Sequence, residues 1–271
     1  MSCTGKLEIC AATRENKTII SNCYYEGALK VSRPIYLEEQ TPNLYLIHIG
    51  GGYVDGDMYV TTLRLEEGAE LIVTTQSSTK VYKTPVHPVL QRTHIELKKG
   101  SVLEYLPDPL ICFEGSRFSQ ETIVHLDEDA CFMLSDIITP GWAEDGSLFY
   151  YDWIRSKLKI FKYNRLVVND HLWLQPDGEM DGILQLDGYT HIGTFLVIHN
   201  SVDQRFLDQV YEEVEMFHED VRFGVSLLPV NGFIFRVLAN RTPIIEQVMT
   251  HIHLFARQSL LGKNGAILRK Y

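Results

Sequence analysis

Hydrophobic and polar residues alternate over most of the first 200 residues, which is the pattern of half-buried β-strands. Two such runs, KLEICAAT and KTIISNCYY, flank the polar turn Arg14–Lys17 and predict a β-hairpin. A second hairpin is predicted where YVTTLRL and AELIVTT flank the turn residues Glu66, Glu67 and Gly68. Two later strands, DWIRSKLKIF and RLVVNDHLWL, are joined by the short turn Lys162–Asn164. The chain is therefore predicted to be mainly β.

A similar unit occurs three times after the second predicted hairpin begins. LEEGAEL starts at Leu65, LKKGSVL at Leu97 and LDEDACF at Leu126, and each places a charged turn between an outgoing and a returning strand. The spacings of 32 and 29 residues fall in the range of repeat architectures. We therefore expect a stacked-sheet or β-solenoid-like (β-helical) core, although a plain meander with similar turns would show the same pattern.

Two α-helices are predicted in the C-terminal third. The first runs from about Val202 to Glu219, with Ser201 as its N-cap. The second begins near Thr242, with Pro243 at the first helical position, and ends at Gly262. No linker rich in Pro, Gly and Ser divides the chain, so we predict a single domain over residues 1–271.

Composition excludes several classes of function. A hydrophobic content of 45% and a charged content of 22% are ordinary for a soluble globular protein. The net charge of −10 argues against a nucleic-acid surface, and the apolar runs are too short to span a membrane. The N-terminus lacks the apolar core of a signal peptide, and the five cysteines have no zinc-binding spacing. We therefore predict a cytoplasmic protein with free thiols and without a nucleic-acid or membrane partner.

Familiar catalytic and nucleotide-binding motifs are absent from the sequence. There is no G-x-S-x-G, no H-E-x-x-H, no phosphate-binding G-x-x-x-x-G-K-[ST] and no G-x-G-x-x-G. The glycine-rich stretch GGGYVDGDMY carries Asp55 and Asp57, whose charges oppose anion binding by the backbone amides. We interpret it as a structural turn in which Asp57 bonds to nearby backbone amides.

One enzyme alternative stays open. The chain has enough carboxylates for the catalytic pair of a glycosidase, and β-solenoids host sugar-cleaving enzymes. The candidates are Asp108, Glu114, Asp136, Glu144, Asp145, Asp152 and Asp170. Trp142, Trp153 and Trp173 would stack on a sugar, although core packing is the commoner role of tryptophan. A cytoplasmic β-solenoid carbohydrate-active enzyme is thus one alternative, and a β-rich binding module unrelated to metals is another.

The ten histidines do not form a preformed metal site. They are scattered along the chain, and His251 and His253 point to different faces of the predicted helix. A tight nickel site would need converging imidazole, thiolate or carboxylate groups. We therefore expect no tightly bound cofactor, and leave open which side chains would touch a metal. A protein that passes a metal on needs weak, exchangeable ligands.

The pattern GG-x-V-x-GD, a strand pair and then TT-x-x-x-TK-x-Y resembles the opening signature of the UreD/UreH urease accessory proteins. It is carried by Gly51, Gly52, Val54, Gly56, Asp57, Thr74, Thr75, Thr79, Lys80 and Tyr82. The segments LEYLPDPLICFEGSRF and LLGKNGAILRKY resemble later parts of the same family, so the resemblance covers nearly the whole chain.

The resemblance implies a non-enzymatic urease maturation factor. Such a protein is expected to act as a scaffold that links apo-urease to the accessory proteins UreF and UreG. The assembly delivers nickel into the urease active site, and this chain would hold nickel only transiently, if at all.

Several residues in the matched segments are expected to contact a partner or line an ion path. They are Asp57, Thr79, Lys80, Tyr82, Asp136 and Asp170. Lys80, Tyr82 and Lys83 form a small basic, aromatic patch that we interpret as a partner contact. The resemblance also implies that the C-terminal region binds the helical accessory protein UreF. Lys263, Arg269 and Lys270 of the polar tail would become ordered in that complex.

Overall fold

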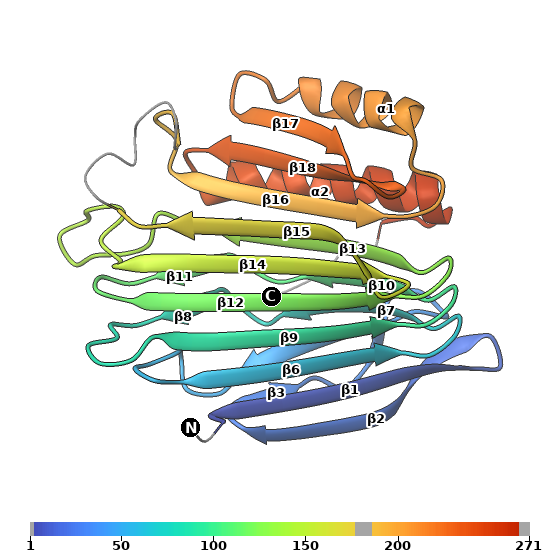
Figure 1. Cartoon of the computed structure of the whole chain (residues 1–271), viewed down its shortest axis with the longest axis horizontal. Coiled ribbons are helices and arrows are strands. Elements are labelled where there is room, and N and C mark those ends of the chain that lie inside the picture. Colours follow the sequence, from blue (N-terminus) through green and yellow to red (C-terminus); the bar gives the residue numbers. More distant parts are fainter. Residues whose placement is uncertain (1–2, 177–185, 266–271) are drawn as a thin grey trace.

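Two β-sheets face each other in the computed structural model, which describes residues 3–176 and 186–265 (Figure 1). The seven-stranded sheet contains, in spatial order, β15 (Arg165–Leu174), β14 (Trp153–Lys162), β12 (Arg117–Leu126), β9 (Val89–Leu97), β6 (Met58–Leu65), β1 (Gly5–Arg14) and β2 (Lys17–Gly27). The main path of the eleven-stranded sheet is β17 (Arg222–Leu227), β18 (Gly232–Ala239), β16 (His191–Ile198), β13 (Cys131–Ile138), β10 (Val102–Leu106), β7 (Glu70–Thr75), β5 (Pro42–His48) and β3 (Leu29–Val31). The short strands β4 (Ile35–Tyr36), β8 (Thr79–Val81) and β11 (Leu110–Cys112) join it beside this path.

The three repeated units are coils of a solenoid. In each unit the chain leaves one sheet and enters the other, from β6 to β7, from β9 to β10 and from β12 to β13. Successive coils pair in parallel, β6 with β9 and β9 with β12 in one sheet, and β7 with β10 and β10 with β13 in the other. The prediction of a mainly β, solenoid-like core is therefore confirmed.

The predicted hairpin at residues 66–68 is wrong. Strands β6 and β7 do not pair with each other but lie in opposite sheets. Leu63, Leu65 and Leu71 are all buried between those sheets, so each strand still shows the alternation of a half-buried strand. The alternation shows which face of a strand is buried, but it does not show which strand is its neighbour. It is the same whether the next strand pairs with it in one sheet or packs against it from the opposite sheet.

The charged turns between the sheets stack on one another. The amide of Gly68 donates to the carbonyl of Lys99 over 3.0 Å, and the amide of Gly100 donates to the carbonyl of Glu128 over 3.0 Å. Both glycines have positive φ, +67° and +64°, a conformation that favours residues without a side chain. The stacking of equivalent turns fixes the register of the coils.

The two other predicted hairpins are confirmed. Strand β1 pairs with β2 around Glu15 and Asn16, and β14 pairs with β15 around Tyr163 and Asn164. All four turn residues have positive φ, as in tight two-residue hairpin turns.

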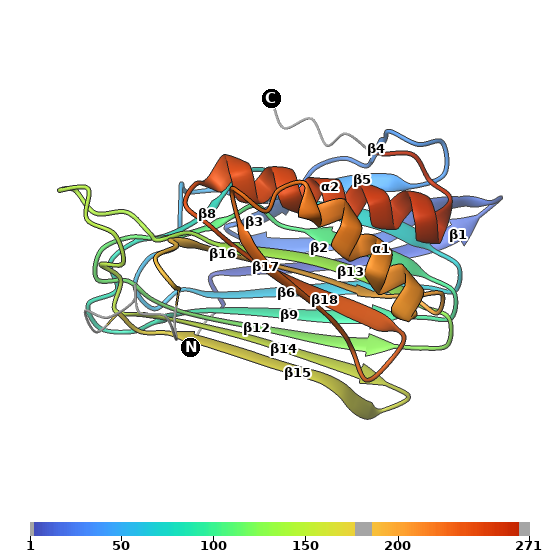
Figure 2. The same ribbon diagram turned by 90° about the horizontal axis from the view of Figure 1, so that it is seen from above.

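Helices α1 (Gln204–Glu215) and α2 (Thr242–Leu261) cover the outer face of the larger sheet (Figure 2). The end of α2 at Gly262, which has φ +64°, is confirmed. The N-cap of α1 is Asp203, whose carboxylate accepts from the amide of Phe206 at 2.9 Å, so the predicted cap at Ser201 is wrong. The predicted bounds, Val202 and Glu219, are wrong as well, because the helix runs from Gln204 to Glu215. Val202 is only 2% exposed and packs in the core before the helix begins.

Three further expectations concern the whole chain. The five cysteines are free thiols, as predicted. None of the helices in the described ranges is long and apolar enough to cross a membrane. That residues 1–271 form a single domain stays a prediction.

Candidate functional site

A polar row crosses the inner face of the smaller sheet. The inward-facing residues of β9 are Val89, Gln91, Thr93, Ile95 and Leu97. Those of β12 are Phe118, Gln120, Thr122, Val124 and Leu126. The parallel register sets Gln91 beside Gln120, and Gln120 beside Ser156 of β14. The same polar position therefore recurs on successive coils, followed by a threonine on each strand and bounded at both ends by apolar residues.

A second polar row crosses the larger sheet. Asp136 of β13 lies beside Thr194 of β16, and Thr194 lies beside Arg236 of β18. The two rows meet across the interior, because the Gln120 side-chain amide donates to Asp136 Oδ2 and to Ser156 Oγ, both at 2.9 Å. Arg236 forms an ion pair with Asp170 of β15.

Burial sets the protonation chemistry of this layer. It raises the pKa of Asp136, which the hydrogen bonds from Gln120 and Ser156 oppose and the negative charge of Asp170 reinforces. The carboxyl group of Asp136 thus binds a proton more readily than an exposed aspartate does. A positive charge placed beside it would favour its ionised form.

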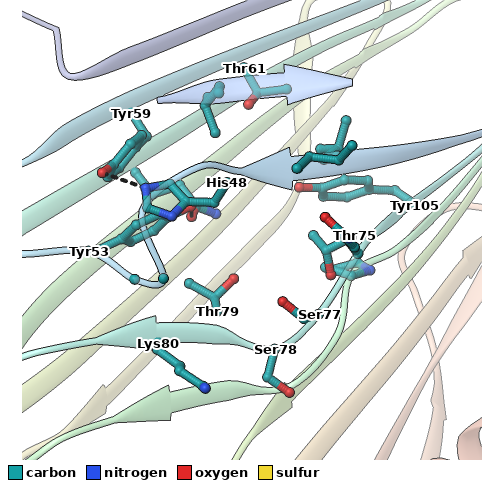
Figure 3. A pocket seen from close by; sticks show the side chains of 18 residues that line it. His48, Tyr53, Tyr59, Thr61, Thr75, Ser77, Ser78, Thr79, Lys80 and Tyr105 are labelled. Atoms are coloured by element: carbon teal, nitrogen blue, oxygen red, sulfur yellow. Dashed lines mark hydrogen bonds between the residues drawn. The ribbon is translucent and has the colours of Figure 1, made fainter. Parts of the chain in front are cut away.

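Two adjoining cavities occupy the polar layer. The first has a volume of about 190 Å³ and lies against the glycine turn, where His48, Gly52, Thr61, Thr75 and Lys80 are among its lining residues (Figure 3). The second, of about 60 Å³, contains Gln120, Asp136, Ser156 and Asp170. Both are lined by Thr79, Gln91, Tyr105 and Pro107. Four residues that were predicted from separate segments therefore line this pair of cavities. They are Thr79, Lys80, Asp136 and Asp170.

Asp57 holds the glycine turn together. Its carboxylate accepts hydrogen bonds from the amide of Val54 at 2.8 Å, the hydroxyl of Tyr59 at 2.8 Å and the hydroxyl of Thr4 at 3.0 Å. The expected bond to a backbone amide is thus present. Asp57 lies behind Tyr59 and lines neither cavity.

An aromatic row lies beside the first cavity. The ring of Tyr82 packs on Phe113 at a centroid distance of 4.7 Å, and Phe113 packs on Trp142 at 5.0 Å. The Tyr82 hydroxyl donates to the carbonyl of Gly51, a residue that lines the cavity. Trp142 is 52% exposed, and the preference for core packing of the tryptophans is wrong for this residue and for Trp173. Phe113 and Trp142 lie at isolated bridges outside regular strands, where periodicity carries no signal.

Of the three residues predicted to bind a partner in the C-terminal tail, only Lys263 lies within the described residues. Lys263 donates to Thr41 Oγ1 at 2.9 Å and forms an ion pair with Glu70, so its side chain is already fixed against β7. Arg269 and Lys270 lie outside the described residues. The role of all three in partner binding stays a prediction.

Three carboxylates of the enzyme alternative share a cavity that is too small for a sugar. Asp108, Asp136 and Asp170 share the small cavity of about 60 Å³, whereas ligand pockets usually measure about 300–1,000 Å³. A larger hollow of about 890 Å³ beside Trp153 contains one carboxylate among its described lining residues, Asp152, which pairs with Arg117. In the described part of the chain, no three His, Cys, Asp or Glu side chains are grouped to hold a metal ion.

Comparison with known proteins identifies the family of the chain. The sequence model of the family described as UreD urease accessory protein matches residues 3–270. The chain is 65% identical to the urease accessory protein UreD of Bacillus sp. (strain TB-90) over the full length of both. It is 38% identical to UreD of Staphylococcus epidermidis and 37% identical to UreD of Lachnoclostridium phytofermentans, covering 99% of this chain and 98% of each relative. The chain belongs to the UreD family of urease accessory proteins.

Proposed function

We propose that this chain is a urease maturation factor that passes nickel ions through its interior while it links apo-urease to UreF and UreG. The observation that supports the ion path is the polar layer between the sheets. Solenoid interiors exclude water best when every inward residue is apolar, yet here Gln91, Gln120 and Asp136 interrupt the core at adjoining positions. All three are half-buried, and polar groups removed from water cost stability unless they are satisfied, so their recurrence suggests a function.

The side chains of the layer suit a cargo ion that must leave again. Hydroxyl, amide and carboxylate oxygens are weak ligands for nickel, which prefers nitrogen and sulfur donors. The thiols of Cys112 and Cys131 are buried, and burial raises the pKa of Cys112 to about 12, which keeps it protonated. An ion in the two cavities would therefore exchange its ligands readily rather than be trapped.

The scaffold role is supported by the aromatic row Tyr82–Phe113–Trp142, with Lys80 and Lys83 beside it. Exposed aromatic side chains contribute strongly to protein interfaces, and lysines would complement an acidic partner. Tyr82 bonds to a residue that lines the first cavity, so a partner seated on this row would lie next to that cavity. Contact and ion transfer would then occur at the same end of the molecule.

The proposal is tested in a host that carries the urease structural and accessory genes of one source. With this gene deleted, urease should accumulate normally but contain little nickel and have little activity. Urease abundance, bound nickel and activity are measured with the gene present and absent. Equal nickel content in both strains would overturn the maturation role.

A further inference from the structure

We infer that His48 is a transient ligand for the divalent cation in the first cavity, and that Tyr59 and Asp57 hold its ring in the tautomer that binds metal. The inference rests on the proposed function and deepens it, because it names a site along the ion path. His48 ends β5 and lines the cavity together with the hydroxyls of Thr61, Thr75 and Thr79 (Figure 3).

A chain of hydrogen bonds fixes the proton on the ring. Tyr59 Oη lies 2.8 Å from Asp57 Oδ2, and an ionised carboxylate only accepts, so the tyrosine hydroxyl donates its single proton there. The same hydroxyl lies 3.0 Å from His48 Nε2 and must accept from it. His48 therefore carries a proton on Nε2.

The second ring nitrogen is then available. With a proton on Nε2, the Nδ1 atom of a neutral imidazole holds a lone pair. Within the described residues, Nδ1 forms no hydrogen bond. A neutral imidazole nitrogen is a good ligand for nickel, unlike the hydroxyl oxygens of Thr61, Thr75 and Thr79 that line the same cavity.

The ring is also held in place by its neighbours. Tyr53 and Tyr59 stack on each other at 3.9 Å, and His48 meets them edge to face at 4.9 and 5.3 Å. Histidines that bind metals commonly donate their other N–H to a carboxylate or carbonyl, which sets the tautomer and orientation. Here Tyr59 stands between His48 and the carboxylate of Asp57. Asp57 is therefore a positioning residue that acts through Tyr59 rather than a ligand itself.

A single imidazole, completed by water and hydroxyl groups, gives the weak site that transfer requires. Four converging protein ligands would hold nickel too tightly to release it. One nitrogen ligand selects nickel over the harder magnesium ion while leaving most of the coordination shell exchangeable. His48 would thus be a point of selection next to the glycine turn, ahead of the oxygen-lined second cavity.

The test is a titration of the purified full chain with Ni²⁺ alone. Affinity is followed by equilibrium dialysis, and the imidazole NMR signals report the site through paramagnetic broadening. We expect the His48 signals of the unmodified protein to broaden first. His48→Gln should weaken the tightest binding at least about tenfold, and Tyr59→Phe should weaken it by a similar factor and mix the two His48 tautomers in its ¹⁵N spectrum. His171→Gln, an exposed histidine on β15, is the control and should bind as the unmodified chain does.

Unchanged nickel affinity in a folded His48→Gln chain would overturn the inference, as would first broadening at any other histidine. Failure of the unmodified chain to bind Ni²⁺ would also overturn it. If His48→Gln does not fold, the broadening order in the unmodified protein still decides. None of these outcomes depends on the gene-deletion experiment, in which unchanged nickel content of urease defeats the proposed function instead.

Discussion

Arg257 Nε of α2 lies 2.9 Å from Glu104 Oε1 of β10, and the two side chains are 0% and 2% exposed. His253 Nε2, one turn earlier on α2, lies 2.5 Å from the other carboxylate oxygen. Arg257 also reaches Glu38 at 2.7 Å. Burial opposes the ionisation of Glu104, but the hydrogen bonds and charges of His253 and Arg257 outweigh it and hold the pKa of Glu104 below its ordinary value. This network attaches the C-terminal helix to the solenoid.

Replacing one member of that network should be costly. Glu104→Gln leaves the buried guanidinium of Arg257 with less compensation, and we expect a loss of about 3–5 kcal/mol in the free energy of unfolding. Urea unfolding measures it, with Glu212→Gln on the exposed face of α1 as the control. A loss no larger than that of the control would contradict the structural role of the network.

The same network makes stability depend on pH. Because the folded pKa of Glu104 is lowered, its contribution is present above the ordinary value of 4.5 and is lost as pH falls through the folded value. The melting temperature of the unmodified chain should therefore fall in acid more steeply than that of Glu104→Gln. Parallel acid profiles of the two proteins would contradict this assignment.

Asp136→Asn should separate stability from function. The folded pKa of Asp136 is raised, so its favourable contribution is complete below the ordinary value of 3.8 and is lost as pH rises through the folded value. At about pH 7 the asparagine variant should melt higher than the unmodified chain, with the difference disappearing in acid. Nickel loading of urease should nevertheless fall, because one of the carboxylates that line the ion path is gone. Full loading by the folded variant would remove Asp136 from the path.

Ser156→Leu should block the second cavity. The added volume fills part of a space of about 60 Å³ and removes the hydroxyl that accepts from Gln120. We expect a modest loss of stability, about 1–3 kcal/mol, and a several-fold loss of nickel in urease. Ser226→Leu, on an exposed position of β17, makes the same change outside the path. If both variants load urease equally, nickel does not pass the second cavity.

Trp142→Ala tests the aromatic row as a contact surface. Removing an exposed tryptophan costs little stability, whereas removing an interface anchor costs about 2 kcal/mol of binding. Binding of the chain to UreF, UreG and apo-urease is measured separately, with Tyr163→Ala at the tip of the β14–β15 hairpin as the control. Unchanged binding to all three partners would rule out this surface.

The row of glutamines could have been predicted from the spacing of the repeat, although the alternation within each strand does not reveal it. Gln91 and Gln120 are separated by 29 residues, the spacing of Leu97 and Leu126 at the turns of the repeat. Aligning the coils by those leucines would have placed the two glutamines side by side. Their hydrogen bond to Asp136 was not predictable in the same way, because Asp136 belongs to the opposite sheet and its position depends on how the coils close.

The long strands, the second helix, the repeat and the membership of the family could be predicted from the sequence alone, because alternation, capping residues and spacing are local properties of the chain. Tertiary structure decided which strand pairs with which. The turn at residues 66–68 serves a crossing between sheets as well as it would a hairpin, and only the pairing with neighbouring coils selects the crossing. It also decided the roles of Asp57 and Lys263, whose partners Thr4 and Glu70 lie far away in sequence. Such contacts depend on the packing of the whole chain, which no local pattern records.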